Sequence, residues 1–479
     1  MDYVLLAAFI VYSLFVLTVG VWGYRKESFA AYAVAGRSLQ TPLATGSFVA
    51  TFLSAITVIG VSGYASRYGW SAAAFTCYGY AVGWILLVVA ARRMHESGLT
   101  TVPEFLRTRY ESVGLGVFAA LAIIGLYSIT LVVQLLGVAI ALNMLIGFAV
   151  PTAILLVGGI FVTYTVLGGL VSVVRTDIVQ AVLLGGGVVV GAIVVLWRTG
   201  FEVISSPPEP LSHFFAGNVQ NTGDLVGWAL VWGLGIPTQS YYLHRFYASR
   251  DTHVARMQIA LGSIVIMVLL LSVIICGVGA GMLVPPDQVG DGAFPYLFKN
   301  VIGGWASVFV LLAITASVHS TTDGLLHIVG LYFAVDVYKP ASGGVTEAQL
   351  LRVSRQATMI FGATVTLIAT YVSLNPVPLI SLIAAIAWGG MASTLFVPLF
   401  FGLFWSRATR AGALASSTGG LTVAAIAFYL KRLGVFEFHE IYPGIIASLV
   451  LMVVVSLTTR PNTDQAINRF FASGVPNDA

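Results

Sequence analysis

Three hydroxyl-bearing residues of the stretch SVHSTTDG, residues 317–324, have the spacing needed to act together. Ser317, Ser320 and Thr321 stand at positions i, i+3 and i+4, so in a helix they share one face. Hydroxyl and backbone carbonyl oxygens are the ligands that a hard cation prefers. Two hydroxyls and one carbonyl of this face are therefore candidate ligands for such an ion. The alternative is that the hydroxyls bond carbonyls of their own helix.

A second stretch, ATFLSAITVIGVSG at residues 50–63, could supply the remaining oxygens. It is apolar enough for a membrane helix, yet hydroxyls and glycines interrupt it. In an intact helix the carbonyl of residue i bonds the amide of residue i+4. If the helix unwinds near Ser54–Thr57, the carbonyls of Ala50 and Leu53 lose those partners and become free to bind an ion. The sequence therefore predicts a broken helix here.

A third stretch, WGLGIPTQSYY at residues 232–242, predicts a second broken helix. Gly233, Gly235 and Pro237 interrupt an apolar run, and proline removes one backbone hydrogen bond of a helix. Transporters built from inverted repeats often mark their binding site with one discontinuous helix in each repeat. A simple kink or close helix packing is the alternative for either break alone.

The elements that must position these residues are membrane helices. The chain has 479 residues, of which 58% are hydrophobic and 9% are charged, far fewer charges than a soluble domain carries. Apolar runs of roughly 20 residues recur throughout, which predicts an all-α polytopic membrane protein with about thirteen transmembrane helices. These segments are predicted at residues 3–24, 42–63, 70–91, 114–143, 150–167, 177–197, 225–246, 255–284, 302–337, 354–373, 378–405, 412–430 and 441–459.

The order of the segments predicts one transporter domain, 1–479, that contains an internal repeat. Five segments begin at the first break (42–197) and five at the second (225–405). Because five is odd, the second set must enter the membrane with opposite topology. One helix (3–24) precedes this inverted five-plus-five repeat, and two (412–459) follow it.

The basic residues predict the orientation. With the N-terminus outside and the C-terminus in the cytoplasm, most of the 23 Lys and Arg residues lie on the cytoplasmic side, as the positive-inside rule requires. Arg25 and Lys26 are among them, and Arg67 is an exception on the outer side. The net charge of +4 follows this topology and does not indicate a nucleic-acid partner. The chain also lacks the phosphate loops, metal-spaced clusters and nucleophile motifs of enzymes.

Several further motifs make the chain similar to the sodium:solute symporter family, and some details are most similar to its pantothenate and monocarboxylate branches. The resemblance spans nearly the whole chain and implies a LeuT-like fold in the cell membrane, with sodium ion as the coupling ion. The motifs are AGRSL (35–39), LTTVPEFLRTRY (99–110), YTVLGGLVSVVRTDIVQ (164–180), WGLG with Gln239 and Arg245, STTDG followed by DVYK (320–339), and FGLFWSRATRAGALA (401–415).

The resemblance also assigns an ion site. It implies that sodium binds the carbonyls of Ala50, Leu53 and Ser317 and the hydroxyls of Ser320 and Thr321. Relatives often carry alanine at the position of Ser317, so its side chain is either an extra ligand or inert.

Two acidic residues are predicted to lie near this ion site. Asp177 is implied to lie close to the sodium exit path, and an N-cap of its helix is the alternative. Asp323, with His319 and His327 at i−4 and i+4, forms either a structural polar network or a proton-handling face.

The solute is predicted to bind between the two breaks, near the middle of the bilayer. Ile236 stands where many relatives carry a tyrosine, and the candidate pocket is apolar with few donors. A small carboxylate with an aliphatic body fits such a pocket better than a sugar. The predicted solute-binding residues are Phe52, Ala55, Ile56, Thr57, Phe75, Thr76, Trp232, Ile236, Gln239 and Trp388.

The predicted function is therefore sodium-coupled symport of a small organic solute by alternating access. Two alternatives remain: a proton-coupled transporter of the same fold, resting on Asp323 and its histidines, and a transporter-like membrane sensor that acts with a separate signalling protein.

Overall fold

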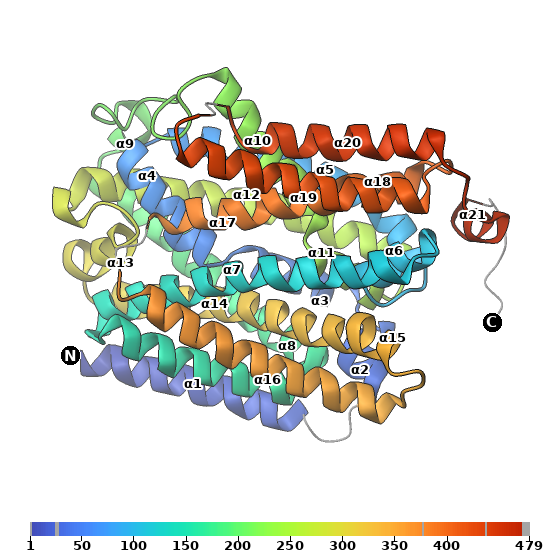
Figure 1. Ribbon diagram of the computed structural model, residues 1–479. Coiled ribbons are helices and arrows are strands. Elements are labelled where there is room, and N and C mark those ends of the chain that lie inside the picture. Colours follow the sequence, from blue (N-terminus) through green and yellow to red (C-terminus); the bar gives the residue numbers. More distant parts are fainter. Residues whose placement is uncertain (1, 24–27, 376–377, 436–437, 472–479) are drawn as a thin grey trace.

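The computed structural model describes residues 2–23, 28–375, 378–435 and 438–471. Within these ranges the chain is a bundle of helices that run nearly parallel to one another (Figure 1), and its β pairing is limited to two isolated bridges. Tyr24, the last residue of the first predicted segment, lies outside the described residues, as do Arg25 and Lys26.

The described residues contain eight helices that are long and apolar enough to cross a membrane, and a ninth if one bent pair is counted as a single span. The remaining predicted segments are also present. α8 covers two predicted segments, and α1, the α10–α11 pair and α16 cover three more, so each of the thirteen predicted segments corresponds to a helix. The bounds are α1 (Tyr3–Gly23), α3 (Thr41–Phe52), η2 (Ile56–Val61), α4 (Ser62–Tyr68), α5 (Ser71–Glu96), α7 (Val113–Ile146), α8 (Val150–Arg198), α10 (Thr222–Gly235), η3 (Ile236–Thr238), α11 (Ser240–Ala248), α12 (Thr252–Leu283), α14 (Trp305–Tyr332), α16 (Glu347–Val372), α17 (Ile380–Met391), η7 (Ala392–Phe396), α18 (Val397–Phe404), α19 (Arg410–Arg432) and α20 (Ile441–Thr458).

The long helix α8 differs from the prediction of two helices joined by a loop. Helical hydrogen bonding continues from Val150 to Arg198, but the backbone departs from helical geometry at Gly169, with φ +56° and ψ −173°. Only glycine adopts this region without strain. Arg175 and Thr176, which fall between the two predicted segments, belong to the second half of the helix, where Thr176 is buried and Arg175 is exposed.

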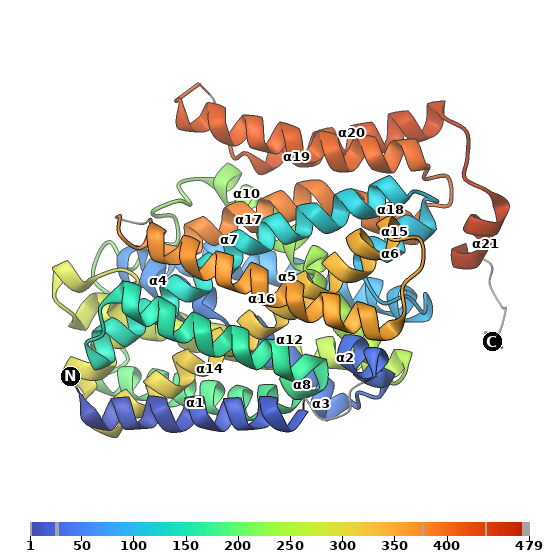
Figure 2. The same ribbon diagram turned by 60° about the horizontal axis from the view of Figure 1, so that its bottom comes forward.

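Two helical elements lie outside the two predicted repeats and pack against them. α1 runs beside α8 and α14 along one side of the bundle, and α19 and α20 pack against each other as a hairpin on another side (Figure 2). The hairpin contacts η7 more than any other single element, and it also contacts α17 and α18.

The start of α1 and the end of α20 lie at opposite ends of the bundle (Figure 1), as an odd number of crossings requires. A short helix, α21 (Asp464–Phe471), packs on α6 (Val102–Arg109), where the rings of Phe470 and Phe105 are 5.4 Å apart.

Candidate functional site

The helix that begins the first repeat is broken close to the predicted position. α3 ends at Phe52, Leu53 is extended with φ −82° and ψ +106°, and the helix resumes at Ile56 with its axis turned by 49°. In a continuous helix the amide of Ala55 would bond the carbonyl of Thr51. Here it donates instead to Oε1 of Gln134 on α7, at 2.9 Å. The side chain of Gln134 therefore holds the break open.

The carbonyls released by this break are met by the predicted hydroxyls of α14. Ser320 Oγ donates to the carbonyl of Ala50 at 2.8 Å, and Thr321 Oγ1 donates to the carbonyl of Thr51 at 2.9 Å. Both hydroxyls also lie near the carbonyl of Ser317, at 3.0 and 3.2 Å. The group is buried and its five oxygens come from neutral groups, which is a donor set suited to a hard cation.

Two details of this cluster bear on the predicted ligands. The Ser317 hydroxyl donates to the carbonyl of Ile314 at 2.8 Å, so its side chain is used within its own helix. Thr321 contacts the carbonyl of Thr51 and not that of Leu53, although Leu53 lies at the break and is buried. The predicted role of the Leu53 carbonyl stays a prediction.

Asp177 forms a buried ion pair beside this cluster. Its Oδ2 accepts hydrogen bonds from the Ser47 hydroxyl and from NH2 of Arg245, the latter at 3.1 Å. Arg245, on α11, also donates to Ser47 Oγ at 2.9 Å and to the Thr51 hydroxyl. Asp177 lies in the second half of α8, whose N-cap is Ala149, so Asp177 is not the N-cap of its helix. The pair joins α8 to both broken helices.

Asp323 takes part in a polar network that excludes one of its two predicted histidines. Its Oδ2 lies 3.0 Å from Nε2 of His319, and its Oδ1 accepts from the Thr165 hydroxyl at 3.0 Å. On the other side of the His319 ring, Nδ1 lies 2.8 Å from Nε2 of Gln180 and 3.2 Å from the hydroxyl of Tyr12.

His327 lies elsewhere, with its ring 4.9 Å from Tyr32 and 5.8 Å from His244. The network around Asp323 therefore links α14 to α8 and α1 but does not include His327.

The predicted aromatic residues belong to one continuous cluster. The ring of Phe52 lies 5.1 Å from Tyr80, and Tyr80 lies 5.6 Å from Trp232. Trp232 in turn contacts Trp388 at 5.1 Å and Phe75 at 5.6 Å. Tyr80, which the sequence did not single out, connects the ring on the first broken helix with the ring on the second.

Two glycines of α5 allow this cluster to close. A Cβ added at Gly79 would lie 2.6 Å from Cβ of Trp232, and one added at Gly83 would lie 2.6 Å from Cβ of Ile236. Small residues four apart let membrane helices approach closely in this way. Because these two glycines have no side chain, α5 can lie directly against the second broken helix, and Ile236 packs on α5.

The polar members of the predicted solute site bond locally. Thr57 donates to the carbonyl of Phe52 at 3.3 Å, Thr76 to that of Ala72 at 2.7 Å, and Gln239 to that of Gly235 at 3.3 Å. Among the buried donors without a hydrogen-bond partner in the described residues are the indole nitrogens of Trp232, Trp388 and Trp84 and Nε2 of Gln134. A buried donor of this kind calls for an acceptor.

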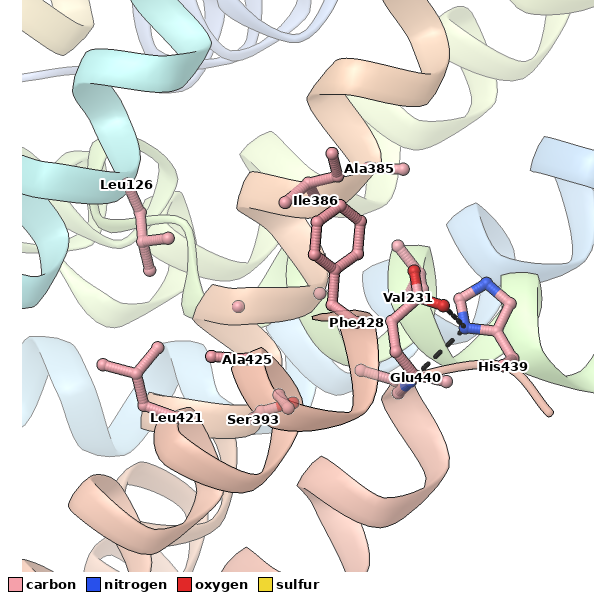
Figure 3. A pocket seen from close by; sticks show the side chains of 14 residues that line it. Leu126, Val231, Ala385, Ile386, Ser393, Leu421, Ala425, Phe428, His439 and Glu440 are labelled. Atoms are coloured by element: carbon pink, nitrogen blue, oxygen red, sulfur yellow. Dashed lines mark hydrogen bonds and ion pairs between the residues drawn. The ribbon is translucent and has the colours of Figure 1, made fainter. Parts of the chain in front are cut away.

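An apolar cavity of about 190 Å³ is lined by residues of α10, α17 and the α19–α20 hairpin (Figure 3). Val231, which precedes Trp232, and Gly389, which follows Trp388, both line it, and Phe428 of α19 closes the opposite wall. None of the predicted site residues lines this cavity. It therefore lies where the helices that carry the tryptophans meet the α19–α20 hairpin.

The model of the sodium:solute symporter family matches residues 32–420 of the chain. The chain belongs to this family. It is therefore a multi-pass membrane transporter and not an enzyme. Relatives named as symporters or transporters cover most of its length.

An uncharacterized symporter, YwcA of Bacillus subtilis, is 27% identical over 84% of this chain and 81% of its own length. The sodium/pantothenate symporter of Haemophilus influenzae is 23% identical, covering 93% of this chain and 94% of its own. The high-affinity proline transporter PutP of Bacillus subtilis is 24% identical, covering 95% and 98%.

Solved structures confirm the fold. A Na⁺-coupled sialic acid symporter in a substrate-bound outward-open state aligns with a TM-score of 0.81 at 19% identity, over 96% of this chain and 99% of its own. Mhp1, a nucleobase–cation transporter in a closed conformation, aligns with a TM-score of 0.57 at 13% identity, over 93% and 98%. The predicted LeuT-like five-plus-five architecture is therefore correct.

Several residues that contribute to the site were not predicted, among them Gln134, Ser47 and Tyr80. Gln134 is a lone amide in the apolar run ITLVVQLLGV, and a polar residue at membrane depth is itself a signal of function. Ser47 stands one turn before Ala50, on the face that carries Thr51. Tyr80 gave no signal because aromatic residues in a membrane helix usually serve packing.

Proposed function

We propose that this chain uses an inward sodium gradient to carry a small organic carboxylate into the cell by alternating access. Its N-terminus is proposed to lie outside and its C-terminus in the cytoplasm. The observation that carries the proposal is the contact between the Ser320 and Thr321 hydroxyls and the carbonyls freed at the first break. Family membership supports ion-coupled transport, whereas the ion site and the solute class rest on this contact and on the donors around it.

The proposed ion ligands are the predicted carbonyls of Ala50, Leu53 and Ser317 with the two hydroxyls, and Thr51 is a further carbonyl within reach. In the structure each hydroxyl donates a hydrogen bond to a carbonyl oxygen of the first broken helix. To bind a cation, the hydroxyls must turn those protons away and present lone pairs, so that the ion replaces two hydrogen bonds with direct coordination. Sodium then holds α14 against the broken helix.

The charge balance supports a carboxylate as the solute. Asp177 is already paired with Arg245, so it cannot neutralise an incoming cation. A sodium ion therefore brings an unbalanced positive charge into a buried site, which a solute carboxylate would neutralise.

The unpartnered N–H groups of Trp232, Trp388 and Gln134 would donate hydrogen bonds to the oxygens of such a group, and the aromatic cluster would contact an apolar body. Pantothenate and proline, named for two relatives, both carry a carboxylate.

Uptake into proteoliposomes tests the proposal. Purified protein is first screened against carboxylates, amino acids and sugars by thermal shift, with and without sodium. The stabilising solute is then followed as it enters vesicles under an imposed sodium gradient at fixed pH. Accumulation that follows the sodium gradient is expected. Accumulation that follows only a proton gradient would establish the alternative that rests on Asp323.

The ion ligands are tested by replacing the hydroxyls singly. Ser320→Ala and Thr321→Val each remove one ligand, which weakens sodium binding by about 1–3 kcal/mol and raises the sodium concentration for half-maximal uptake. Thr315→Val is the matched control because the Thr315 hydroxyl bonds only the carbonyl of Leu311 in the same helix. Equal sodium dependence in all three variants would remove the two hydroxyls from the ion site.

A further inference from the structure

A short segment between α12 and α13 (Ala293–Tyr296) crosses the end of the bundle that the proposal places outside. We call residues 284–292 the strap. Along α4, the amide of Gly290 donates to Ser66 Oγ at 3.0 Å, and NH2 of Arg67 donates to the carbonyl of Val289 at 3.4 Å. Farther along, Oδ2 of Asp291 accepts the amide of Ile380 at 2.9 Å.

This last bond meets the start of α17, where the first amides of a helix lack partners within it. The N-cap of α17, Leu379, has no side-chain acceptor, so Asp291 acts as a cap supplied from a distant segment. The strap thereby ties α4, the outer half of the first broken helix, to α17, which carries Trp388.

The strap fits closely against both helices. A Cβ added at Gly63 of α4 would lie 2.6 Å from Oδ1 and 2.8 Å from the amide nitrogen of Asp291. Beneath it, a Cβ added at Gly60 would lie 3.0 Å from the amide nitrogen of Ser381 of α17. The first broken helix, which carries Thr57, and α17, which carries Trp388, are therefore in contact on this side. The strap covers this contact.

We propose that Asp291 is a positioning residue that seats the strap between α4 and α17, and that seating takes up a proton from the outer solution. The proposal rests on the proposed function: solute that arrives from outside passes between these helices only after the strap has left. We call the place where the strap lies between α4 and α17 the seat. A cavity of about 300 Å³ lies beside it and is lined by Arg67, Asp287, Asp291, Met144 and Leu379 among others.

The surroundings of Asp291 give the sign of the pH dependence. Burial raises the pKa of its carboxyl to about 7, although the Ile380 amide and Arg67 act in the opposite direction. Its Oδ1 has no hydrogen-bond partner within the described residues. Once the strap leaves, the carboxyl is solvated and returns to an ordinary pKa near 4.

The charged groups around the seat are few. Arg67 faces it from α4, Asp287 lies on the strap, and Lys299 beyond α13 donates to the carbonyl of Met144 at 2.8 Å. The residues that α7 and the start of α17 contribute to the cavity, Ile140, Met144 and Leu379, are uncharged.

Because the pKa is higher in the seated state, protonation favours seating. The seated state is most populated at acid pH and loses population as the pH rises through about 7. With pKa values of about 7 and about 4 in the two states, the seated-to-open ratio falls roughly tenfold between pH 6 and pH 8.

The test measures access to a thiol placed under the strap. Met144 packs against the strap, since a Cβ added at Gly292 would lie 2.8 Å from its methyl group. Met144→Cys is made in full-length protein with Cys77→Ser and labelled in sodium-free liposomes with a membrane-impermeant maleimide. Each rate is divided by that of an exposed reference, Ser205→Cys, which cancels the intrinsic pH dependence of thiol reactivity.

The normalised rate is expected to rise about tenfold from pH 6 to pH 8, and to be flat in Asp291→Asn. Asp287→Asn, which removes the other acid of the strap, should keep the rise. Should Asp291→Asn fail to fold, Arg67→Gln should move the midpoint to higher pH, because Arg67 favours the ionised carboxylate.

A flat rate with Asp291 intact, or an unchanged rise in Asp291→Asn, would overturn the proposal. Since labelling needs neither sodium nor solute, either outcome is distinct from failure of sodium-driven uptake.

Discussion

The two broken helices satisfy their backbones in different ways. At the first break, the groups that leave the helix are met by side chains from other helices: Gln134 takes the amide of Ala55, and Ser320 and Thr321 take the carbonyls of Ala50 and Thr51. All of these partners are neutral, and each could exchange its hydrogen bond for another contact.

The second break is satisfied mainly by its own residues. The Thr238 hydroxyl donates to the carbonyl of Gly235 at 2.6 Å, and Nε2 of Gln239 reaches the same oxygen at 3.3 Å. The amide of Gln239 bonds the carbonyl of Ile236 at 3.1 Å, and Pro237 has no amide to satisfy.

When the backbone groups at a break bond to side chains of other helices, an ion that binds between those helices can change the break. When they bond to side chains of the break itself, its shape is fixed. The first break therefore suits an ion-dependent switch, and the second suits the rigid presentation of Trp232. The sharpest tests change one break and leave the other intact.

The largest effect is expected at the ion pair that joins both breaks. Arg245→Gln leaves the carboxylate of Asp177 buried without its charge partner, and this should lower the free energy of unfolding by about 3–5 kcal/mol. Thermal or denaturant unfolding of the purified protein in detergent measures the loss.

Arg250→Gln is the matched control because the Arg250–Asp251 pair is exposed, at 61% and 41% of the two side chains, and should cost at most about 1 kcal/mol. If both variants lost the same stability, the buried pair would not be what fastens α8 to the two broken helices.

An intermediate effect is expected at the amide that holds the first break open. Gln134→Leu leaves the amide of Ala55 without its acceptor, which should cost about 1–3 kcal/mol of unfolding free energy. The free amide can then return to the carbonyl of Thr51 and straighten the helix, which takes that oxygen away from Thr321. The thermal stabilisation produced by added sodium should therefore shrink.

Gln180→Leu removes another buried amide, one that bonds Tyr12 and His319 and no group of the first broken helix within the described residues. It should lower stability while leaving the stabilisation by sodium unchanged. An equal loss of the sodium effect in both variants would show that Gln134 has no special relation to the break.

The breaks themselves could be predicted from sequence because they depend on local chemistry. Hydroxyls, glycines and a proline inside apolar runs marked both positions, and the Ser320–Thr321 spacing marked the face of α14 that meets the first break. The first interruption begins at Leu53, slightly before the predicted Ser54–Thr57. Position within an apolar run fixes a break only to within about a turn.

The partners across the bundle could not be predicted, since they are far apart in the chain. Gln134 stands 79 residues from Ala55, and Arg245 stands 68 from Asp177. His319 and His327 share a helical face with Asp323, yet the neighbours of that face change along α14. Only His319 lies beside the carboxylate, while His327 packs against Tyr32. Spacing along one helix gives the face but not what the face meets.

The smallest effect is expected at the second break. Thr238→Val removes a hydroxyl whose acceptor, the carbonyl of Gly235, is also reached by Gln239, so the cost should be about 0.5–1.5 kcal/mol. Because the hydrogen bonds of Thr238 and Gln239 in the described residues stay within this break, the sodium dependence of uptake should match that of the unmodified protein, whereas the isosteric change Thr321→Val should weaken it. If Thr238→Val instead weakened the sodium dependence as much as Thr321→Val does, both breaks would respond to the ion. The contrast between a switching break and a fixed one would then have to be abandoned.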